Sequence, residues 1–247
     1  MSVASGFSVI VSMPPMCQGC PVRQFGVCRA LGMAELAKLK QIEQRRVIAP
    51  GQTIVAEGEN APFVATIVSG VVKMTKRLID GRQQIVGFLF DCGFLGRPFA
   101  AESPFTAEAV SNTILHTYQR QQFEDLLRAS PGLEHNLYAL MLGELDAAQN
   151  WMLLLGQKTA REKVASLILL FARHSRHGHN QPLTSPVRYM LPLSRAEMAD
   201  FLGLRLETVS RQMTGLKAED VIRLEAEHVV VIPRMERLLA AAETPDN

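Results

Sequence analysis

The sequence has few cysteines, no long apolar run and almost no net charge. Its 247 residues include four cysteines and one tryptophan, and the formal net charge is +2. No apolar run reaches the roughly 18 residues that a membrane-spanning helix needs. The short apolar stretch 7–13 lacks the preceding basic segment of a signal peptide. These absences predict a cytoplasmic protein without a membrane segment, and a hydrophobic content of 47% allows sizeable cores.

Three of the four cysteines lie close together near the N-terminus. Cys17, Cys20 and Cys28 form a Cys-x2-Cys-x7-Cys run, and Cys92 is the fourth. In a reducing compartment, clustered thiols indicate metal binding or redox chemistry rather than a structural disulfide. Four thiolates can hold a [4Fe–4S] cluster, and Gly19 helps the first two to converge from a tight loop. A four-cysteine structural zinc site, or free thiols without a metal, fits the same count.

The first half of the chain has the pattern of short antiparallel strands. Over residues 46–118, β-branched runs alternate with glycine turns, several of them 11 or 12 residues apart, as in a meander, sandwich or barrel. The runs 64–68 and 85–90 predict buried strands, and Asp80-Gly81 predicts a hairpin turn. A short helix is expected before this region, over residues 34–42.

A long helix is predicted over residues 133–155, after a short one that ends before Ser130-Pro131. Its apolar residues recur at intervals of 4, 3, 4 and 3 in a heptad seam: Met141, Leu145, Ala148, Met152 and Leu155. A partner helix buries such a seam, so a homodimer is expected; packing on the chain's own strands is the alternative. Leu142, Trp151 and Leu153 lie off the seam and are expected to face the strands.

The C-terminal part has the pattern of two helices joined by a tight turn. Ser194, with Glu197 three residues later, forms a capping box that begins the first helix. Gly203 can adopt the positive φ of the turn, and the second helix covers residues 205–218. A small core is predicted from Met198, Leu202, Leu204, Val209 and Met213. This is a helix-turn-helix pattern, with an ordinary helical hairpin as the alternative.

Further elements surround this pair of helices. A helix is predicted over residues 158–174 and a strand over 191–193. The runs 221–224 and 228–232 predict the two strands of a β-wing. From residue 158 to residue 237 there are 13 Lys and Arg against 9 Asp and Glu, a modest basic excess that suits DNA binding.

Glu207, Ser210 and Arg211 are the candidate base-reading residues. They are spaced i, i+3 and i+4 near the start of the second helix, the part of a helix-turn-helix that enters the major groove. Arginine can donate two hydrogen bonds to guanine, glutamate can accept one from cytosine, and serine can do either. The alternative for Glu207 and Arg211 is a surface salt bridge, worth about 0.3–0.5 kcal/mol. Phosphate contacts are predicted at Arg205, Thr208, Gln212 and Lys217.

Three motifs carry a family resemblance: Leu193-Ser194-Arg195, Phe201-Leu202-Gly203-Leu204 and Glu207-Thr208-Val209-Ser210-Arg211. With the strand-rich first half and the long helix, they resemble the superfamily of the cyclic-AMP receptor protein and the fumarate–nitrate reductase regulator. The similarity covers essentially the whole chain. The Glu-x-x-Ser-Arg pattern is more similar to the fumarate–nitrate reductase regulator branch than to the cyclic-AMP branch.

The resemblance implies an α+β fold with four successive parts. A cysteine-rich cluster segment with a short helix covers residues 1–45. A β-roll sensor domain, like those that bind cyclic nucleotides, covers residues 46–130. A dimerisation helix follows over residues 131–157, and a winged helix-turn-helix domain covers residues 158–240.

The same branch implies a function. Its dimers bind a palindrome close to TTGAT-N4-ATCAA in double-stranded DNA, which makes Glu207, Ser210 and Arg211 the base readers. Members with an N-terminal cysteine group hold an oxygen-labile [4Fe–4S] cluster, and its loss in oxygen weakens the dimer. We therefore expect an oxygen-responsive transcription regulator that activates genes for low-oxygen metabolism. By the same resemblance, residues 80–82 contact RNA polymerase.

Two other classes of function were weighed. No glycine-rich cofactor loop, nucleophile constellation or paired-carboxylate site stands out, so we do not expect an enzyme. A regulator of the same fold with a structural zinc site, or with another signal, is the alternative to the oxygen sensor.

The sequence departs from the branch at the fourth cluster ligand. The cysteine usual at this place is replaced by His116, while Cys92 lies earlier in the chain. Because thiolate is the usual iron–sulfur ligand, Cys92 is favoured over His116. The gap between Cys20 and Cys28 is also longer than in the best-known member, which costs little closure entropy.

The residues that would surround a cyclic-nucleotide phosphate differ as well. Cyclic-AMP binders place a Gly-Glu pair and an Arg-Ser pair around the phosphate, and the matching positions here are Gly96-Arg97 and Thr106-Ala107. Without that glutamate and that arginine, we expect no cyclic nucleotide as a ligand. A haem sensor of the same fold would leave the cysteine group unexplained.

Overall fold

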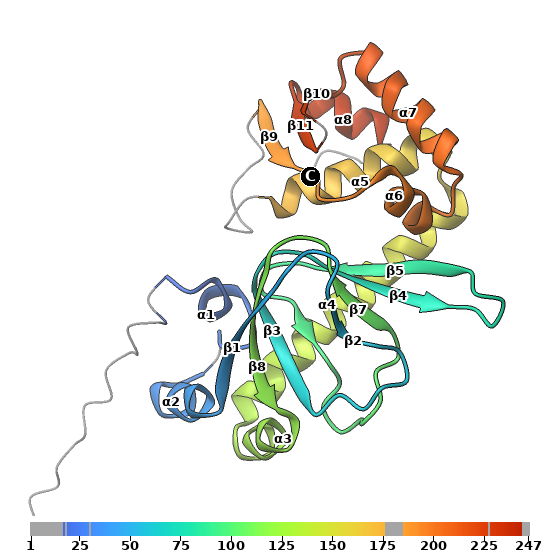
Figure 1. Ribbon diagram of the computed structural model, residues 1–247. Coiled ribbons are helices and arrows are strands. Elements are labelled where there is room, and N and C mark those ends of the chain that lie inside the picture. Colours follow the sequence, from blue (N-terminus) through green and yellow to red (C-terminus); the bar gives the residue numbers. More distant parts are fainter. Residues whose placement is uncertain (1–16, 18, 30, 176–184, 227, 244–247) are drawn as a thin grey trace, which may run out of the picture.

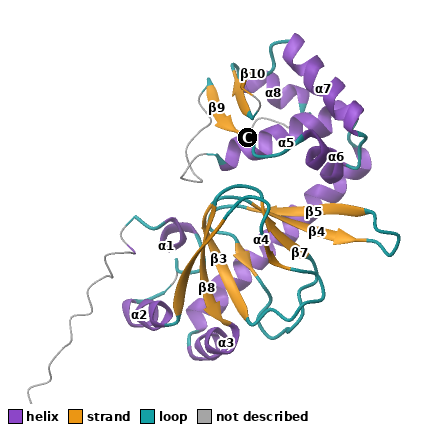
Figure 2. Cartoon of the chain, viewed as in Figure 1, coloured by secondary structure: helices purple, strands orange, loops and turns teal. Residues whose placement is uncertain are grey.

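One long helix connects a strand-rich part of the chain to a helix-rich part (Figure 1). The computed structural model describes residues 17, 19–29, 31–175, 185–226 and 228–243. Residues 1–16 of the predicted cysteine segment lie outside the described residues. Figure 2 shows that strands dominate the first part and helices the second. This arrangement confirms the predicted α+β fold with a β-roll, a long helix and a C-terminal helix-turn-helix.

The first part is a roll of two antiparallel four-stranded sheets. One sheet has the order β1-β8-β3-β6 and the other the order β2-β7-β4-β5. Ile67, Leu89 and Leu115 belong to the apolar core that these strands enclose. The strands are β1 (Glu43–Ile48), β2 (Thr53–Val55), β3 (Phe63–Ser69), β4 (Val72–Arg77), β5 (Gln83–Leu89), β6 (Phe94–Leu95), β7 (Thr106–Ala109) and β8 (Thr113–Gln119).

The predicted strands and hairpin of this part are confirmed. The runs 64–68 and 85–90 correspond to β3 and β5. Asp80-Gly81 lies in the turn that joins β4 to β5, where Gly81 has a φ of 86°. That left-handed region is open to glycine at little cost, and the Gly81 N–H donates to Leu78 O at 3.0 Å.

Four helices flank the roll. Pro131 begins the long helix, where a proline fits because its missing N–H would have no partner. Within the described chain, no helix is long and apolar enough to cross a membrane. The four helices are α1 (Pro21–Phe25), α2 (Met33–Gln41), α3 (Arg120–Ala129) and α4 (Pro131–Gln157).

Most of the predicted seam of α4 is exposed in the single chain. Met141, Leu145 and Met152 are exposed, with Met152 at 72%. Because apolar side chains at heptad spacing gain from burial against another helix, this exposure fits a partner helix rather than the strands. The alternative that the seam packs on the chain's own strands is therefore wrong for these residues.

The expectation for the off-seam residues of α4 is also wrong in part. Leu142 and Leu153 are 43% and 58% exposed and do not face the strands. Trp151 is half-buried, but it packs against Phe201 of the C-terminal part, with ring centroids 5.0 Å apart. The reason is that this half of α4 also lies beside the C-terminal part, where Leu154 is buried.

The C-terminal part packs helices around a small sheet of order β10-β11-β9. The wing is confirmed, since β10 and β11 pair antiparallel. The elements are α5 (Ala160–His174), β9 (Val187–Met190), α6 (Arg195–Leu202), α7 (Leu206–Ala218), β10 (Arg223–Ala226), β11 (Val229–Ile232) and α8 (Met235–Ala241).

The strand predicted over residues 191–193 is wrong, because β9 precedes it and pairs with β11. Pro192 has no N–H to donate to a ladder. Leu191 and Leu193 are instead buried in the core of the C-terminal part, which explains why their alternation is typical of a strand. The Leu191 N–H still donates to His228 O at 2.7 Å, and the pairing ends at Pro192.

Candidate DNA interface and cysteine centre

A cap and a glycine turn fix the two helices of the helix-turn-helix. Glu197 N–H donates to Ser194 Oγ, and Ser194 N–H donates to Glu197 Oε2 at 2.9 Å, which confirms the capping box. Gly203 ends α6 with a φ of 61° and donates its N–H to Ala199 O. The predicted core between the helices is buried at Met198, Leu202, Val209 and Met213, and Leu204 is half-buried.

The candidate base readers lie on one face of α7. Glu207 and Arg211 are exposed, and Ser210 is half-buried. Neither the Glu207 nor the Arg211 side chain has an ion-pair or hydrogen-bond partner among the residues that the structure describes. The predicted alternative of a salt bridge between them is therefore absent from this part of the chain. Both side chains are available for base edges, and their roles stay predictions.

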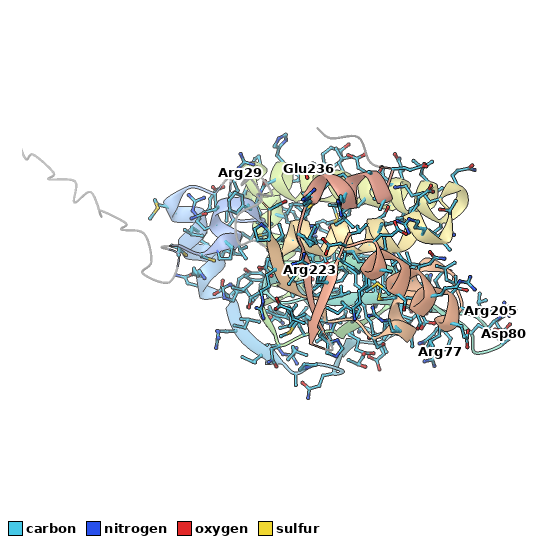
Figure 3. The ribbon with its side chains drawn as sticks, turned by 90° about the horizontal axis from the view of Figure 1, so that it is seen from above. Arg29, Arg77, Asp80, Arg205, Arg223 and Glu236 are labelled. Carbon is cyan, nitrogen blue, oxygen red and sulfur yellow. The ribbon has the colours of Figure 1, made fainter. Side chains whose placement is uncertain are left out.

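The predicted phosphate contacts flank this face. Arg205 is exposed immediately before α7 (Figure 3), and Lys217 is exposed in its last turn. On the wing, Arg223 is also exposed, but its guanidinium already pairs with Asp220 at 2.7 Å. Arg205 is therefore better placed than Arg223 to bind a phosphate.

The four cysteines are free thiols, and three of them are buried. Cys17 and Cys28 lie in the apolar cluster under α2 and α3, with the half-buried Cys20 against it. Cys92 lies in the turn between β5 and β6 with a φ of 71°. Its N–H donates to Ile67 O at 2.8 Å. The cysteines therefore come from the N-terminal segment and from the rigid roll.

Burial dominates the pKa of the three buried thiols. The pKa of Cys28 and of Cys92 is raised to about 12, mainly by burial, with a smaller contribution from Cys20 at Cys28 and from Asp91 and then Cys20 at Cys92. Burial also raises the pKa of Cys17, where Lys40 opposes the shift and Cys20 adds to it. Cys20 is thus near enough to contribute to the raised pKa of each of the other three.

The residues present fit an iron–sulfur cluster as a donor set. Four thiols can each bind a different iron, and metal coordination deprotonates a thiol whose pKa is otherwise high. Within the described chain, Arg23 Nε is a buried donor without a hydrogen-bond partner, which suits an anionic group nearby. Within the same residues, no three His, Cys, Asp or Glu side chains already stand close enough to hold a single metal ion.

His116, the alternative fourth ligand, is buried in a different polar group. Its Nδ1 lies 3.1 Å from Glu43 Oε2, and Lys40 Nζ donates to Glu43 Oε1 at 2.6 Å. Tyr118 OH donates to the same carboxylate at 3.4 Å. Burial alone would raise the pKa of Glu43, but the hydrogen bonds from His116 and Lys40 outweigh it and lower that pKa. The choice of Cys92 over His116 stays a prediction.

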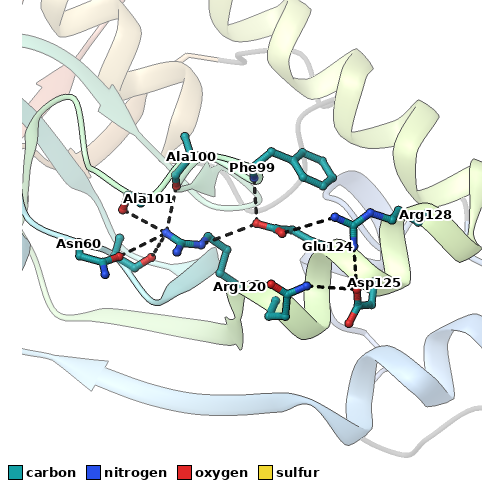
Figure 4. A network of polar contacts seen from close by, with 10 residues as sticks. Asn60, Phe99, Ala100, Ala101, Arg120, Glu124, Asp125 and Arg128 are labelled. Carbon is teal, nitrogen blue, oxygen red and sulfur yellow. Dashed lines mark hydrogen bonds and ion pairs between the residues drawn. The ribbon is translucent and has the colours of Figure 1, made fainter.

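A polar network fixes the loop between β6 and β7 to α3 (Figure 4). Arg120 Nη1 donates to the carbonyls of Ala61 at 2.9 Å and Ala100 at 3.1 Å. Glu124 Oε1 accepts from Phe99 N–H at 2.9 Å. Phe99 has a φ of 65°, a costly conformation for a bulky residue. The network compensates for that cost by holding the loop at both sides.

Gly96 and Arg97, the predicted counterparts of a phosphate-binding pair, line a small cavity beneath this loop. Ser103 and Phe105 also line it, and its volume is about 10 Å³. That volume holds roughly one water molecule. The prediction that no cyclic nucleotide binds stays a prediction.

The fold and the reading face define a class: a DNA-binding regulator with a β-roll, a long helix with an exposed apolar seam and a winged helix-turn-helix. Comparisons with known proteins agree for the β-roll and for the helix-turn-helix. Residues 45–130 match the cyclic nucleotide-binding domain, and residues 162–241 match the Crp-like helix-turn-helix domain.

Known relatives extend the match over nearly the whole chain. The chain is 41% identical over 226 residues to the transcriptional activator protein FnrL of Cereibacter sphaeroides, covering 92% of this chain and 91% of the relative. It is 43% identical over 238 residues to a probable transcriptional activator of Rhizobium leguminosarum bv. viciae, covering 96% and 98%. The solved structure of FixK2 from Bradyrhizobium japonicum matches with a TM-score of 0.73 and 29% identity, over 83% of this chain and 99% of that one.

The chain therefore belongs to the CRP/FNR family of transcription regulators. This assignment confirms the resemblance and the prediction that the chain is not an enzyme. Membership of this family also implies that the chain forms dimers and that it binds DNA through the helix-turn-helix.

Proposed function

We propose that the protein is an oxygen-responsive transcription activator whose [4Fe–4S] cluster is held by Cys17, Cys20, Cys28 and Cys92. The observation that carries the proposal is that Cys17, Cys20 and Cys28 gather at one apolar cluster, while Cys92 lies near enough to Cys20 for that residue to contribute to its raised pKa. These four are all the cysteines of the chain. The relative from Cereibacter sphaeroides, itself named a transcriptional activator, supports activation.

The surrounding residues favour an anionic group at this place. When bound, a [4Fe–4S] cluster would supply the oxygen-labile redox chemistry that the side chains lack. Lys40 lowers the pKa of Cys17 and of Cys28, against the larger effect of burial. Arg23 Nη1 donates to Cys28 O at 2.9 Å and orients that part of the loop. Cys92 would tie the N-terminal segment to the roll.

The DNA target that we propose is the palindrome TTGAT-N4-ATCAA, bound by a dimer. Glu207, Ser210 and Arg211 would read base edges from α7, and Arg205 would bind a phosphate. The exposed seam of α4 supports a dimer with two such helices. Genes for low-oxygen metabolism are the expected targets.

The β4–β5 hairpin tip is the proposed contact with RNA polymerase. Leu78 and Ile79 are both exposed there, and Arg82 pairs with Asp80 at 2.8 Å to hold the turn. Exposed apolar side chains beside charged ones are typical of protein–protein contacts. Transcription activation in vitro, with Ile79→Ser against wild type, tests this contact separately from DNA binding.

The proposal is tested by purifying the full chain without oxygen and measuring iron, sulfide and zinc per subunit. We expect about four iron and four sulfide, a brown absorption that bleaches in air, and DNA affinity that falls with it. A colourless protein with one zinc would contradict the sensor and leave the DNA-binding function intact. Equal DNA affinity with and without the cluster would contradict oxygen control.

A matched pair of variants tests the fourth ligand. We expect Cys92→Ala to lose bound iron after anaerobic purification, and His116→Gln to retain it. Thermal unfolding of both proteins without metal controls for damage to the roll. Retention of the full cluster by Cys92→Ala, with its loss in His116→Gln, would transfer the ligand role to His116.

A further inference from the structure

A lysine of the β-roll bridges to the first helix of the helix-turn-helix. Lys73 Nζ, on β4, lies 2.8 Å from Glu108 Oε1 on β7 and 2.9 Å from Glu197 Oε1 on α6. The Lys73 side chain is only 14% exposed. We infer that Lys73 is a positioning residue for DNA binding, which holds the helix-turn-helix on the β-roll and so sets the spacing of the two reading helices in the dimer.

Glu197 is well suited to transmit this restraint. Its Oε1 accepts from Lys73, while its Oε2 accepts from the N–H and the Oγ of Ser194 at 2.9 Å each. One carboxylate therefore both caps α6 and binds the roll. Since α6 leads through Gly203 into α7, fixing the start of α6 fixes the helix that carries the base readers.

The register of the sheet places Lys73, Glu108 and Phe88 on the face of the roll that contacts the C-terminal part. Lys73 is directly paired with Phe88 on β5 and with Glu108 on β7. Residues directly opposite each other project from the same face of a sheet. Lys73, Glu108 and Phe88 therefore form one patch, and β5 packs against α6.

Aromatic contacts form the apolar part of the same interface. Phe88 packs against Phe201 of α6 in a tilted arrangement with centroids 4.9 Å apart, and edge-to-face against Phe171 of α5 at 5.3 Å. Gln83 Nε2 also donates to Asp200 Oδ2 at 3.3 Å. Apolar burial is non-directional, whereas a charge-assisted hydrogen bond has a defined geometry. Lys73 thus supplies the orientation that the ring contacts alone do not.

Lys73 adds to the restraints that the connection between the parts already has. Between α4, which ends at Gln157, and α5, which begins at Ala160, Lys158 Nζ donates to Ser166 Oγ at 2.9 Å, and Trp151 of α4 packs against Phe201. These contacts oppose rotation of the reading domain about residues 158–159 at the α4 end, and Lys73 opposes it at the β-roll. Burial lowers the pKa of Lys73, but the hydrogen bonds that it donates to Glu108 and Glu197 outweigh it and raise that pKa. The bridge is therefore charged at neutral pH and restrains that rotation.

The test compares DNA duplexes of two spacings. The full chain, purified without oxygen, is titrated with TTGAT-N4-ATCAA and with the same palindrome carrying one more base pair in the spacer. The extra base pair rotates one half-site by about 35°. Wild type must leave its fixed orientation to bind the longer spacer, so it should strongly prefer N4.

We expect Lys73→Met to lose about tenfold in affinity for the N4 duplex, the effect of losing one charge-assisted hydrogen bond. Its affinity for the longer spacer should be unchanged, so the preference falls by the same factor. Glu197→Gln keeps the capping box, which accepts either residue, and should shift the preference in the same direction. Glu108→Gln leaves the Lys73–Glu197 bridge and should stay within about twofold of wild type.

The inference rests on the proposed palindrome only for the choice of DNA. Backbone hydrogen exchange at the start of α6 gives a readout without DNA, and it should accelerate in Lys73→Met and Glu197→Gln but not in Glu108→Gln. If wild type fails to bind the palindrome, the proposed target is wrong and exchange alone decides. Unchanged spacing preference, or unchanged exchange where DNA is not bound, in both Lys73→Met and Glu197→Gln would overturn the positioning role.

Discussion

Replacing Glu43 by glutamine is expected to destabilise the metal-free protein by about 3–5 kcal/mol, the usual cost of removing one partner of a buried ion pair. The Glu43 side chain is 6% exposed, and that of Lys40 is 14% exposed. Lys40 Nζ donates to both carboxylate oxygens, at 2.6 and 2.7 Å, and His116 Nδ1 lies 3.1 Å away. The glutamine would leave the Lys40 charge buried without a counterion.

Thermal unfolding followed by circular dichroism, in reducing buffer, measures this effect. For a chain of this size, the loss corresponds to a fall in the unfolding midpoint of roughly 6–20 °C. The double variant Lys40→Met, Glu43→Leu should recover most of the loss, because apolar replacement of a buried pair is often neutral. Asp125→Asn is the matched surface control, since the exposed Asp125–Arg128 pair is worth about 1 kcal/mol or less.

Two results would refute this reasoning. If Glu43→Gln unfolds at the wild-type temperature, Lys40 reaches solvent and the pair is not buried in solution. If the double variant is as unstable as the single one, the loss comes from the contacts of Glu43 with His116 and Tyr118 rather than from an unpaired charge.

Three further predictions concern the reading domain and the dimer. Arg211→Ala should weaken DNA binding by about 1–3 kcal/mol per half-site and relax selectivity at one base pair. Fluorescence anisotropy with mutated palindromes measures this, and an equal loss of affinity for all sequences would contradict base reading. Leu145→Glu should leave the anaerobic protein monomeric in analytical ultracentrifugation, because it buries a charge in the α4 seam, and a stable dimer would mean that another surface pairs. Burial raises the pKa of Glu197, but Lys73 and Ser194 outweigh it and lower it below its ordinary 4.5. Its contribution to stability is therefore present above pH 4.5 and lost as pH falls below, and Glu197→Gln should abolish that part of the pH dependence of unfolding.

The helix-turn-helix could be predicted from the sequence because its signals are local. Ser194 and Glu197 form a cap within one turn, and Gly203 marks a positive φ that few other residues adopt cheaply. The seam of α4 is also local, since it depends only on heptad spacing. These features need no knowledge of distant contacts, and the structure has each of them.

The features that the sequence did not predict depend on residues far apart in the chain. The partner of β9 is β11, and two helices and a strand separate them in the chain. Without that partner, the apolar alternation at Leu191 and Leu193 predicts the strand at residues 191–193. The sequence around His116 does not indicate its ion pair with Glu43, because Glu43 comes from the neighbouring strand β1. The bridge of Lys73 cannot be predicted from local sequence, since its partners Glu108 and Glu197 are distant in the chain.

The turn after β5 connects the cysteine region to the interface that holds the DNA-reading domain. Cys92 follows β5, whose Phe88 packs on Phe201. Asp91 Oδ1 in the same turn accepts from the N–H of Gly70 at 2.9 Å. Gly70 stands just before β4, which carries Lys73. A shift of this turn would therefore reach both strands of the interface through the backbone.

If the cluster acts through this turn, wild type and Lys73→Met should respond differently to air. The preference of wild type for the N4 duplex over the longer spacer should fall when the cluster is lost. The reason is that a relaxed Cys92 turn would weaken the contacts of β4 and β5 with α6. In Lys73→Met these contacts are already weakened. Its preference for the N4 duplex should therefore be the same before and after exposure to air, although its iron is lost at the wild-type rate. Glu108→Gln is the control and should respond as wild type does. An equal fall in Lys73→Met and wild type would mean that the oxygen signal bypasses this interface, for example by acting on the α4 seam alone.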